Sequence, residues 1–438
     1  MKTNAEVKLW GTTIGAVSLD DQNKTADFEY NPSFIKSGIQ VSPIMMPLKT
    51  GIYRFPELSY ETYRGLPGLL SDSIPDKFGN TIIDIWLSKQ GRLPESFNAV
   101  ERLCYTGKRG MGALEFFPVI KSDNVDEKIN VSELVELASI VLKNRQNLHA
   151  VLDESDKANM NKSLSQIISV GTSAGGARAK AVVAWNPETK EIRSGQTETE
   201  KGFEHWLIKF SGVSGNKDKE EEDREDFGII EYIYYRMAKE AGINMSECRI
   251  LNDGKNSHFM TKRFDRDDKG NKFHMQTLCA LAHMDFNEAG VYSYEQFFSV
   301  LNQIGVHHQD FVEAFKRMLF NVYAFNCDDH TKNISFLMDK SGQWKLSPAY
   351  DVSFAFNPNG LWTSSHQMTI NGKRKNFTEA DFEVCSKTAN LSLREVKNAI
   401  SDVKSAVAKW KSFAKQNGLA ENRINEIWEI IKVYNSGF

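Results

Sequence analysis

Short apolar runs separated by glycine and aspartate turns fill the first part of the chain. Three of these runs have the length and apolar content of β-strands: 7–9, 13–19 and 26–30. Two stretches, 66–70 and 81–90, have helical patterns, and an apolar strand is expected at 113–120 after the turn GKRGMG. Residues 1–125 are therefore expected to form a β-rich module with inserted helices.

The middle of the chain alternates between strand-like and helix-like patterns. The charged stretch KSDNVDEKIN marks the expected boundary, and an amphipathic helix is expected at 132–144. The run KDKEEEDRED (217–226) is expected to be a solvated loop, and a helix at 228–241 is expected to end at Gly242. Residues 126–270 are expected to form a small mixed lobe whose strands are 179–185, 205–210, 248–252 and 258–264.

From about residue 277 onward the pattern is mainly helical, with two short strands expected at 334–338 and 344–347. The clearest helix is 396–414, where apolar residues recur at three- and four-residue steps, as on a buried helix face. Residues 271–438 are therefore expected to form a helical lobe. Three domains in all agree with a length of 438 residues.

Charge and cysteine content argue against several classes of protein. The 54 basic and 57 acidic side chains give a formal charge of −3, which argues against nucleic-acid binding through bulk electrostatics. The five cysteines are scattered and none forms a Cys-x-x-Cys pair, so neither a zinc site nor a disulfide framework is expected. No apolar run reaches membrane-spanning length, and the N-terminus lacks a signal-peptide core. A cytoplasmic protein is expected.

The segment FNCDDHTKNISFL carries the strongest chemical pattern. Asp328 stands five positions before Asn333, and SPAYDVSFAF offers Asp351 eighteen residues later. This is the spacing of a protein-kinase catalytic loop, in which the Asp receives the substrate hydroxyl proton and the Asn and later Asp hold Mg²⁺. The alternative is a plain turn, because Asp and Asn are also common turn and cap residues.

A second group of residues suits phosphate binding. The segment GTSAGGARAK supplies glycines whose backbone N–H groups can turn toward an anion, although a flexible surface turn explains the segment better when it is taken alone. Lys209 lies among apolar residues in HWLIKF, the strand position of the kinase lysine that holds ATP phosphates. Glu231 on the following helix is its expected acidic partner, and a snorkelling lysine is the alternative.

Taken together, these motifs resemble the HipA-like serine/threonine kinases, which are toxins of type II toxin–antitoxin modules. The motifs that carry the resemblance are SAGGARAK (173–180), Ile208–Lys209, RFDR (263–266), DDHTKN (328–333), Tyr350–Asp351, SIPD (73–76) and GALEF (112–116). They extend over nearly the whole chain. The resemblance implies an α+β, bilobal protein-kinase-like fold with a β-rich N-terminal module and an all-helical C-terminal lobe.

The resemblance also implies a role for each matching residue. Asp328 would be the catalytic Asp, with Asp329 as a rival that the five-position offset disfavours. Asn333 and Asp351 would be Mg²⁺ ligands, and the backbone from Lys262 to Phe264 would meet adenine. The other expected ATP-binding residues are Lys209, Ser173, Ala174, Gly175, Gly176, Lys180, His330 and Lys332.

Two departures from the family pattern affect these roles. Asp351 is followed by Val352 and Ser353, where ordinary protein kinases have Phe-Gly. Ala179 stands where relatives often carry an acidic residue, which leaves the contacts of the glycine loop less defined.

The expected function is therefore an ATP- and Mg²⁺-dependent Ser/Thr protein kinase that inactivates itself by autophosphorylation at Ser173. The resemblance implies a HipB-like antitoxin as partner, contact with DNA only through that antitoxin, and a protein substrate such as an aminoacyl-tRNA synthetase. Two alternatives stay open: a catalytically idle co-repressor bound to an antitoxin, and a small-molecule kinase.

Overall fold

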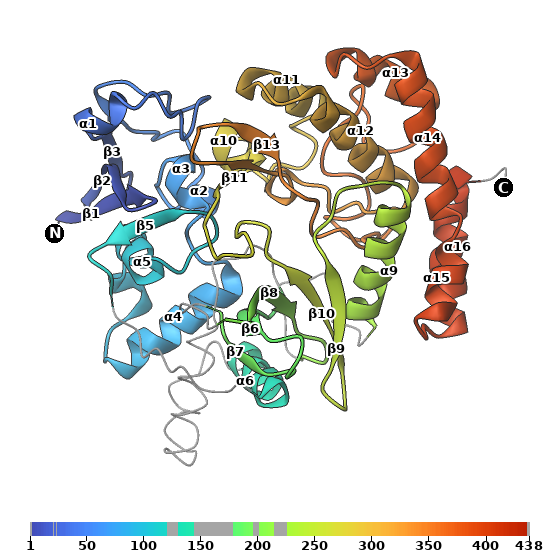
Figure 1. Cartoon of the computed structure of the whole chain (residues 1–438), viewed down its shortest axis with the longest axis horizontal. Coiled ribbons are helices and arrows are strands. Elements are labelled where there is room, and N and C mark those ends of the chain that lie inside the picture. The colour runs from blue at the N-terminus through green and yellow to red at the C-terminus, as the bar shows by residue number, and fades with distance from the viewer. Residues whose placement is uncertain are drawn as a thin grey trace. The chain divides into compact units, whose positions relative to one another are not determined.

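The computed structural model describes residues 2–20, 22, 24–120, 130–143, 178–195, 201–213 and 226–435 (Figure 1). The chain divides into two compact units. The first comprises Met1–Ser42, Met46–Glu225 and Arg249–Met275, and the second comprises Pro43–Met45, Asp226–Cys248 and Gln276–Phe438. The three-domain division predicted from the sequence stays a prediction. Within the described part of the chain, no helix has the length and apolar character needed to cross a membrane.

A five-stranded sheet begins the first unit, in the order β4-β3-β2-β1-β5. Its strands are β1 (Lys2–Leu9), β2 (Thr12–Asp20), β3 (Asp27–Tyr30), β4 (Ile52–Tyr53) and β5 (Leu114–Phe117), and neighbouring strands are antiparallel. The sheet buries one face, because alternate residues such as Val7, Val17 and Phe28 are fully buried. The strands predicted at 7–9, 13–19, 26–30 and 113–120 are confirmed.

Short helices accompany this sheet. They are α1 (Pro32–Ile35), α2 (Tyr60–Tyr63), α3 (Gly68–Ser71), α4 (Lys77–Lys89), a 3₁₀ turn (Pro94–Ser96) and α5 (Ala99–Thr106). Helix α5 starts at a capping box in which Asn98 and Glu101 satisfy each other's backbone N–H groups. Helix α4 starts at Asp76, whose side chain accepts from the backbone N–H of Gly79 at 2.7 Å.

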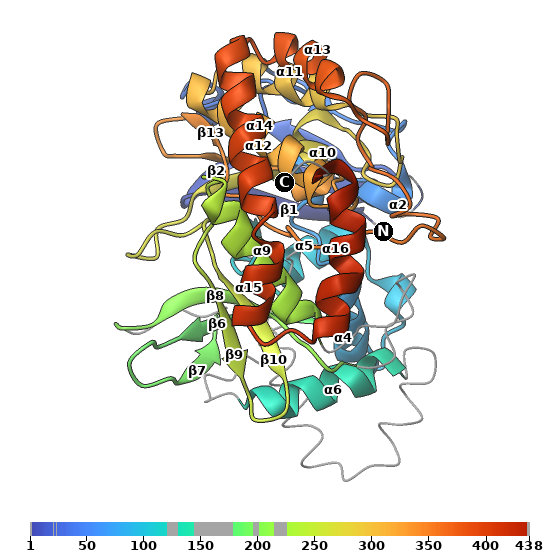
Figure 2. The same cartoon turned by 90° about the vertical axis from the view of Figure 1, so that its right-hand side faces the viewer.

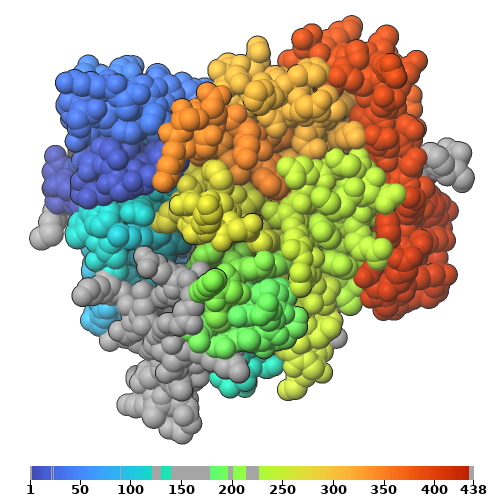
Figure 3. Space-filling view, in the orientation of Figure 1, coloured from blue at the N-terminus to red at the C-terminus, as the bar shows by residue number. Residues whose placement is uncertain are grey.

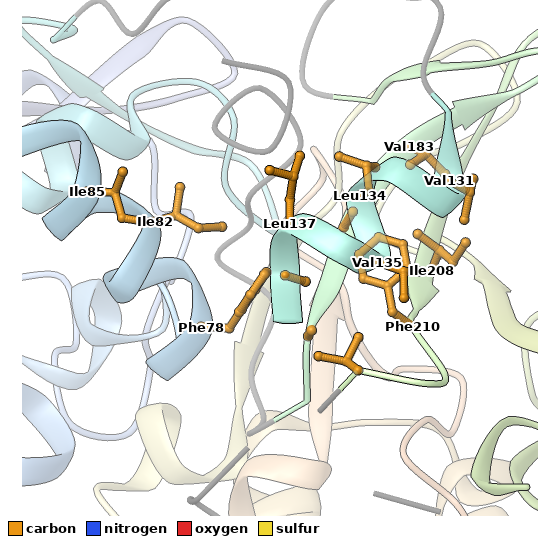
Figure 4. Close-up of a cluster of buried hydrophobic side chains, with 14 of the residues drawn as sticks. Phe78, Ile82, Ile85, Val131, Leu134, Val135, Leu137, Val183, Ile208 and Phe210 are labelled. Atoms are coloured by element: carbon orange, nitrogen blue, oxygen red, sulfur yellow. The ribbon is translucent and has the colours of Figure 1, made fainter. Parts of the chain in front are cut away.

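A second five-stranded sheet has the order β7-β6-β8-β10-β9. Its strands are β6 (Lys180–Trp185), β7 (Ile192–Ser194), β8 (Glu204–Lys209), β9 (Cys248–Asn252) and β10 (Ser257–Lys262). Helix α6 (Val131–Lys143) and helix α4 pack their apolar residues into one core with this sheet (Figure 4). The core includes Phe78 and Ile82 from α4, Leu134 from α6, and Val183 and Ile208 from the sheet.

A buried ionic network joins the two sheets of the first unit. The carboxylate of Asp265 is fully buried and pairs with Arg263 and Arg266, each at 2.7 Å. It also accepts from the backbone N–H of Gly112 at 2.7 Å, and both guanidinium groups donate to the carbonyl of Gly110. Despite its burial, the two arginines hold the pKa of Asp265 well below its usual range. The GKRGMG turn is therefore fixed to the RFDR segment by charge-assisted hydrogen bonds.

Helices dominate the second unit (Figure 2). They are α9 (Phe227–Glu240), α10 (Leu278–Ala282), α11 (Tyr294–Ile304), α12 (His308–Tyr323), α13 (Glu379–Thr388), α14 (Leu393–Val407), α15 (Trp410–Gln416) and α16 (Glu421–Asn435). Helix α9 packs beside α14 and α15 in the cartoon and in the space-filling view (Figure 3). The buried ring of Tyr234 on α9 contacts the indole of Trp410 at a centroid distance of 5.8 Å.

The single helix predicted at 396–414 is wrong in one respect, because the chain breaks it between α14 and α15. The backbone N–H of Lys409 bonds to Ala406, three residues back, which tightens the turn at the break. Trp410 is then fully buried, and its indole N–H donates to the carbonyl of Ile424 at 3.0 Å. A buried indole usually finds such a partner, and here the partner lies on another helix.

A small sheet of order β11-β12-β13 lies before the last helices. Its strands are β11 (His274–Thr277), in which the chain passes from the first unit to the second, β12 (Ser335–Met338) and β13 (Trp344–Leu346). Strands β12 and β13 form an antiparallel hairpin, which confirms the two strands predicted here. The hairpin connects the segment of Asn333 to the segment of Asp351.

Candidate active site

The loop that carries Asp328 follows helix α12 through a sharp turn. Phe325 has a left-handed backbone (φ +52°), and its ring packs on that of Phe356 at 5.1 Å between centroids. The backbone N–H of Cys327 donates to the carbonyl of Ala355 at 2.9 Å, and that of Ala355 donates to Phe325 at 3.1 Å. These bonds hold the Asp328 loop beside the segment that follows Asp351.

Asp328 presents a partly exposed carboxylate, with 41% of its side chain accessible. The indole Nε1–H of Trp362 donates to its Oδ1 at 2.7 Å, and Nε2 of His330 lies 3.7 Å from the same oxygen. The side-chain amide of Asn333 donates to the backbone carbonyl of Asp328 at 2.9 Å. The five-residue spacing therefore closes a loop, with Asn333 in a 3₁₀ turn (Thr331–Asn333).

Asp329, one residue later, is buried and fully engaged. Its carboxylate accepts from the Tyr294 hydroxyl at 2.9 Å, His366 Nδ1 at 3.0 Å and the Gln367 backbone N–H at 2.7 Å. Burial disfavours a charged imidazole, yet the carboxylate of Asp329 raises the pKa of His366 to about 10. Asp329 thus holds the loop in place while Asp328 faces outward. This geometry favours Asp328 as the reacting carboxylate, an assignment that stays a prediction.

Asn333 and Asp351 line the same small cavity of the second unit, together with Asp329, His330 and Tyr350. The side-chain nitrogen of Asn333 donates to the backbone carbonyl of Asp328, so the side-chain oxygen of Asn333 is the atom that could bind a cation. Asp351 holds an unusual left-handed backbone (φ +53°). Two oxygen ligands completed by water and phosphate suit Mg²⁺. Among the described residues, no group of three or more His, Cys, Asp or Glu side chains could hold a metal by itself.

His330 and Lys332 belong to this loop, and both side chains contact the ring of Phe286. The rings of His330 and Phe286 lie 5.2 Å apart, and Nζ of Lys332 lies 5.1 Å from the centroid of Phe286. The hydroxyl of Tyr350 donates to the backbone carbonyl of Lys332 at 2.8 Å, which ties the metal motif to the loop. Contact of either side chain with ATP stays a prediction.

The predicted phosphate-binding residues of the first unit lie on its second sheet. Lys209 ends β8, and its ammonium lies 5.7 Å from the ring centroid of Phe259 on β10. Lys180 starts β6 and is buried, with Nζ 3.2 Å from the carboxylate of Asp76. The Lys180 ammonium is thus directed at the start of helix α4, and its predicted contact with ATP stays a prediction.

The remaining predicted residues are less constrained. Ser173, Ala174, Gly175 and Gly176 lie outside the described residues. Lys262 pairs with Glu204 at 3.0 Å and Asp268 at 3.1 Å, and Phe264 follows β10. Contact of the Lys262–Phe264 backbone with adenine stays a prediction. Glu231 is buried on α9 in the second unit, whereas Lys209 belongs to the first, so their pairing stays a prediction.

Four residues near Asp328 were missed by the sequence prediction: Tyr294, Trp362, His366 and Gln367. Gln367 is buried, and its side-chain amide donates to the carbonyls of Cys327 at 3.2 Å and Trp362 at 2.5 Å. Three of them, Trp362, His366 and Gln367, follow Asp351 in a segment of mixed apolar and polar residues that gives no pattern pointing to Asp328.

The hairpin that joins the segments of Asn333 and Asp351 belongs to a mixed α/β chain with a protein-kinase-like fold. The HipA-like C-terminal domain model matches residues 172–410, and the HipA N-terminal domain model matches residues 5–117. The first of these covers more than half of the chain. The chain belongs to the HipA family.

Two individual proteins extend this comparison. The chain shares the fold of HipA from Shewanella oneidensis MR-1, solved with HipB and operator DNA, at a TM-score of 0.66 and 16% identity over 99% of this chain and 96% of that one. A candidate kinase from Haemophilus influenzae is 28% identical over 134 residues, which are 28% of this chain and 39% of the relative. The match therefore spans well under half of that curated relative.

Proposed function

We propose that this chain is an ATP- and Mg²⁺-dependent Ser/Thr protein kinase of the HipA type. The observation that carries the proposal is the contrast between two adjacent carboxylates. Asp329 is buried and saturated by three donors, whereas Asp328 is partly exposed on the same loop as Asn333. A loop built in this way presents one carboxylate to a substrate hydroxyl.

The proposed roles follow from what each side chain offers. Asp328 accepts the proton of the substrate hydroxyl as that oxygen bonds to the γ-phosphorus, while the bond from the γ-phosphorus to the β,γ-bridging oxygen breaks and ADP leaves. Asn333 and Asp351 line one cavity and would hold Mg²⁺ through their side-chain oxygens, and the ion would neutralise charge on the ATP phosphates. Lys209 contributes a positive charge at the end of β8 for the phosphates.

The direct test is transfer of labelled γ-phosphate from ATP by the full chain. We expect turnover with Mg²⁺, and its loss when EDTA removes the metal, because the phosphate charge is then no longer neutralised. Turnover that continues in EDTA would contradict the proposed metal dependence. A chain that binds ATP but transfers no phosphate under either condition would favour an idle co-repressor instead.

We also propose that Ser173 is the site of autophosphorylation and that its phosphate inactivates the kinase. A phosphoserine adds about −1.5 to −2 charges, which would repel ATP phosphates from the loop that is proposed to cover them. Incubation with Mg²⁺-ATP followed by peptide mass spectrometry is expected to find phosphate on Ser173, with activity falling as it accumulates. Ser173→Ala is expected to stay active for longer. Equal decay of both proteins would contradict self-inactivation.

The partner proposed for this chain is a HipB-like antitoxin. The Shewanella protein of the same fold was solved together with HipB and operator DNA, which supports this proposal. The near-neutral charge of the chain suits contact with DNA through such a partner better than direct binding.

A further inference from the structure

We propose that Trp362 is a positioning residue that orients the carboxylate of Asp328 for proton transfer; this inference rests on the kinase function proposed above. The indole Nε1–H donates to Oδ1 of Asp328 at 2.7 Å, a short hydrogen bond from a neutral donor. A carboxylate held through one oxygen has a fixed rotamer, so its other oxygen has a defined direction. The substrate hydroxyl needs that direction to be correct.

The position of Trp362 is itself fixed by the catalytic loop. The side-chain amide of Gln367 donates both to the carbonyl of Trp362 and to that of Cys327, the residue before Asp328. The backbone N–H of Gln367 donates to the buried carboxylate of Asp329 at 2.7 Å. The backbone at Trp362 and the backbone next to Asp328 are therefore anchored to the same buried amide.

A second contact restrains the indole ring from the side. The ring of His330 lies 6.3 Å from that of Trp362 in an edge-on arrangement, and His330 in turn packs on Phe286. The neighbouring Leu361 is 99% exposed, so the loop presents one residue to solvent and turns the next onto Asp328. An indole whose ring packs on His330 and whose backbone carbonyl is held by Gln367 acts as a restrained donor.

The test compares Trp362→Phe with Trp362→His in the full chain. Both remove the indole and have rings of similar size, but only His returns a ring N–H donor. Initial rates of phosphate transfer from Mg²⁺-ATP, measured against ATP concentration, give kcat and KM separately. We expect Phe to lower kcat about tenfold or more with little change in KM, since a hydrogen bond to a charged group is lost. The His variant should recover part of that loss.

Two control variants separate this role from a general effect. Trp10→Phe deletes another indole donor with an equally short bond, to the carbonyl of Lys272 at 2.7 Å in the first unit. Leu361→Ala perturbs the same loop without touching Asp328. Both are expected to keep kcat within about twofold, well short of the loss expected for an N–H···carboxylate bond.

Three results would each overturn the positioning role. They are equal kcat values for Trp362→Phe and Trp362→His, a loss that falls on KM for ATP instead of kcat, and an equal loss of kcat in Leu361→Ala. Thermal melting of all variants checks that the fold is intact. A wild-type chain that transfers no phosphate would overturn the proposed function itself, and this inference with it.

Discussion

Asp328→Asn is expected to lower the rate of phosphate transfer by about 10²- to 10⁴-fold, the usual contribution of a positioned general base. Asparagine has nearly the shape of aspartate, and its side-chain oxygen can still accept from the Trp362 indole. The loop closure by Asn333 uses the backbone carbonyl of residue 328, which the substitution leaves in place. The loss should therefore reflect the missing proton acceptor. Rates of transfer from labelled Mg²⁺-ATP measure it.

Asp402→Asn is the matched control for this variant. Its carboxylate is about as exposed, at 49%, and pairs with Lys316 on the helical surface of the same unit. The substitution removes the same charge and is expected to leave the rate unchanged. Comparable rates for wild type and Asp328→Asn would show that Asp328 is not the base.

Asp329→Ala is expected to cost about 3–5 kcal/mol of stability, as when one partner of a buried ion pair is removed. The substitution leaves His366 buried beside the hydroxyl of Tyr294 without the carboxylate that both contact. It also leaves the backbone N–H of Gln367 without its acceptor. Urea unfolding followed by circular dichroism measures the change, and Asp402→Ala, at an exposed position, should be close to neutral.

The pair of His366 and Asp329 is expected to make the free energy of unfolding fall as the pH rises. The pKa of His366 is about 10 in the folded chain, above its ordinary value of 6.5. The folded chain therefore holds a proton that the unfolded chain has released above pH 6.5. The contribution of His366 is complete below about pH 6.5 and declines as the pH rises toward 10. His366→Asn should lack this decline, and a variant that keeps it would refute the assigned pair.

The elements that the sequence predicted correctly are those with local periodicity. Strands β1, β2 and β3 alternate buried and accessible residues, and α4, α6 and α9 repeat their apolar positions at helical spacing. The hairpin around Asp339 was also predicted, because two short apolar runs flank a polar turn. The five-residue spacing of Asp328 and Asn333 corresponds to a contact in the structure, because the Asn333 side chain donates to the backbone carbonyl of Asp328 and closes that loop.

The features that local patterns missed depend on distant partners. Tyr294 lies 35 residues from Asp329 along the chain, and His366 lies 37 residues away on the other side. The ion pair of Lys180 with Asp76 could not be predicted either, because the two residues lie far apart in the sequence of the first unit. The break after α14 likewise depends on Ile424, which accepts from Trp410. No window of neighbouring residues contains such pairs.

The network around Asp265 has a consequence for how the family domains can be separated. The C-terminal domain match starts at residue 172, yet Arg263 and Arg266 donate to the carbonyl of Gly110, which lies in the N-terminal match. Cutting the chain at the domain boundary would expose two guanidinium groups and remove an N–H donor from a fully buried carboxylate. The two family domains therefore share a buried network, and neither is expected to fold as well without the other.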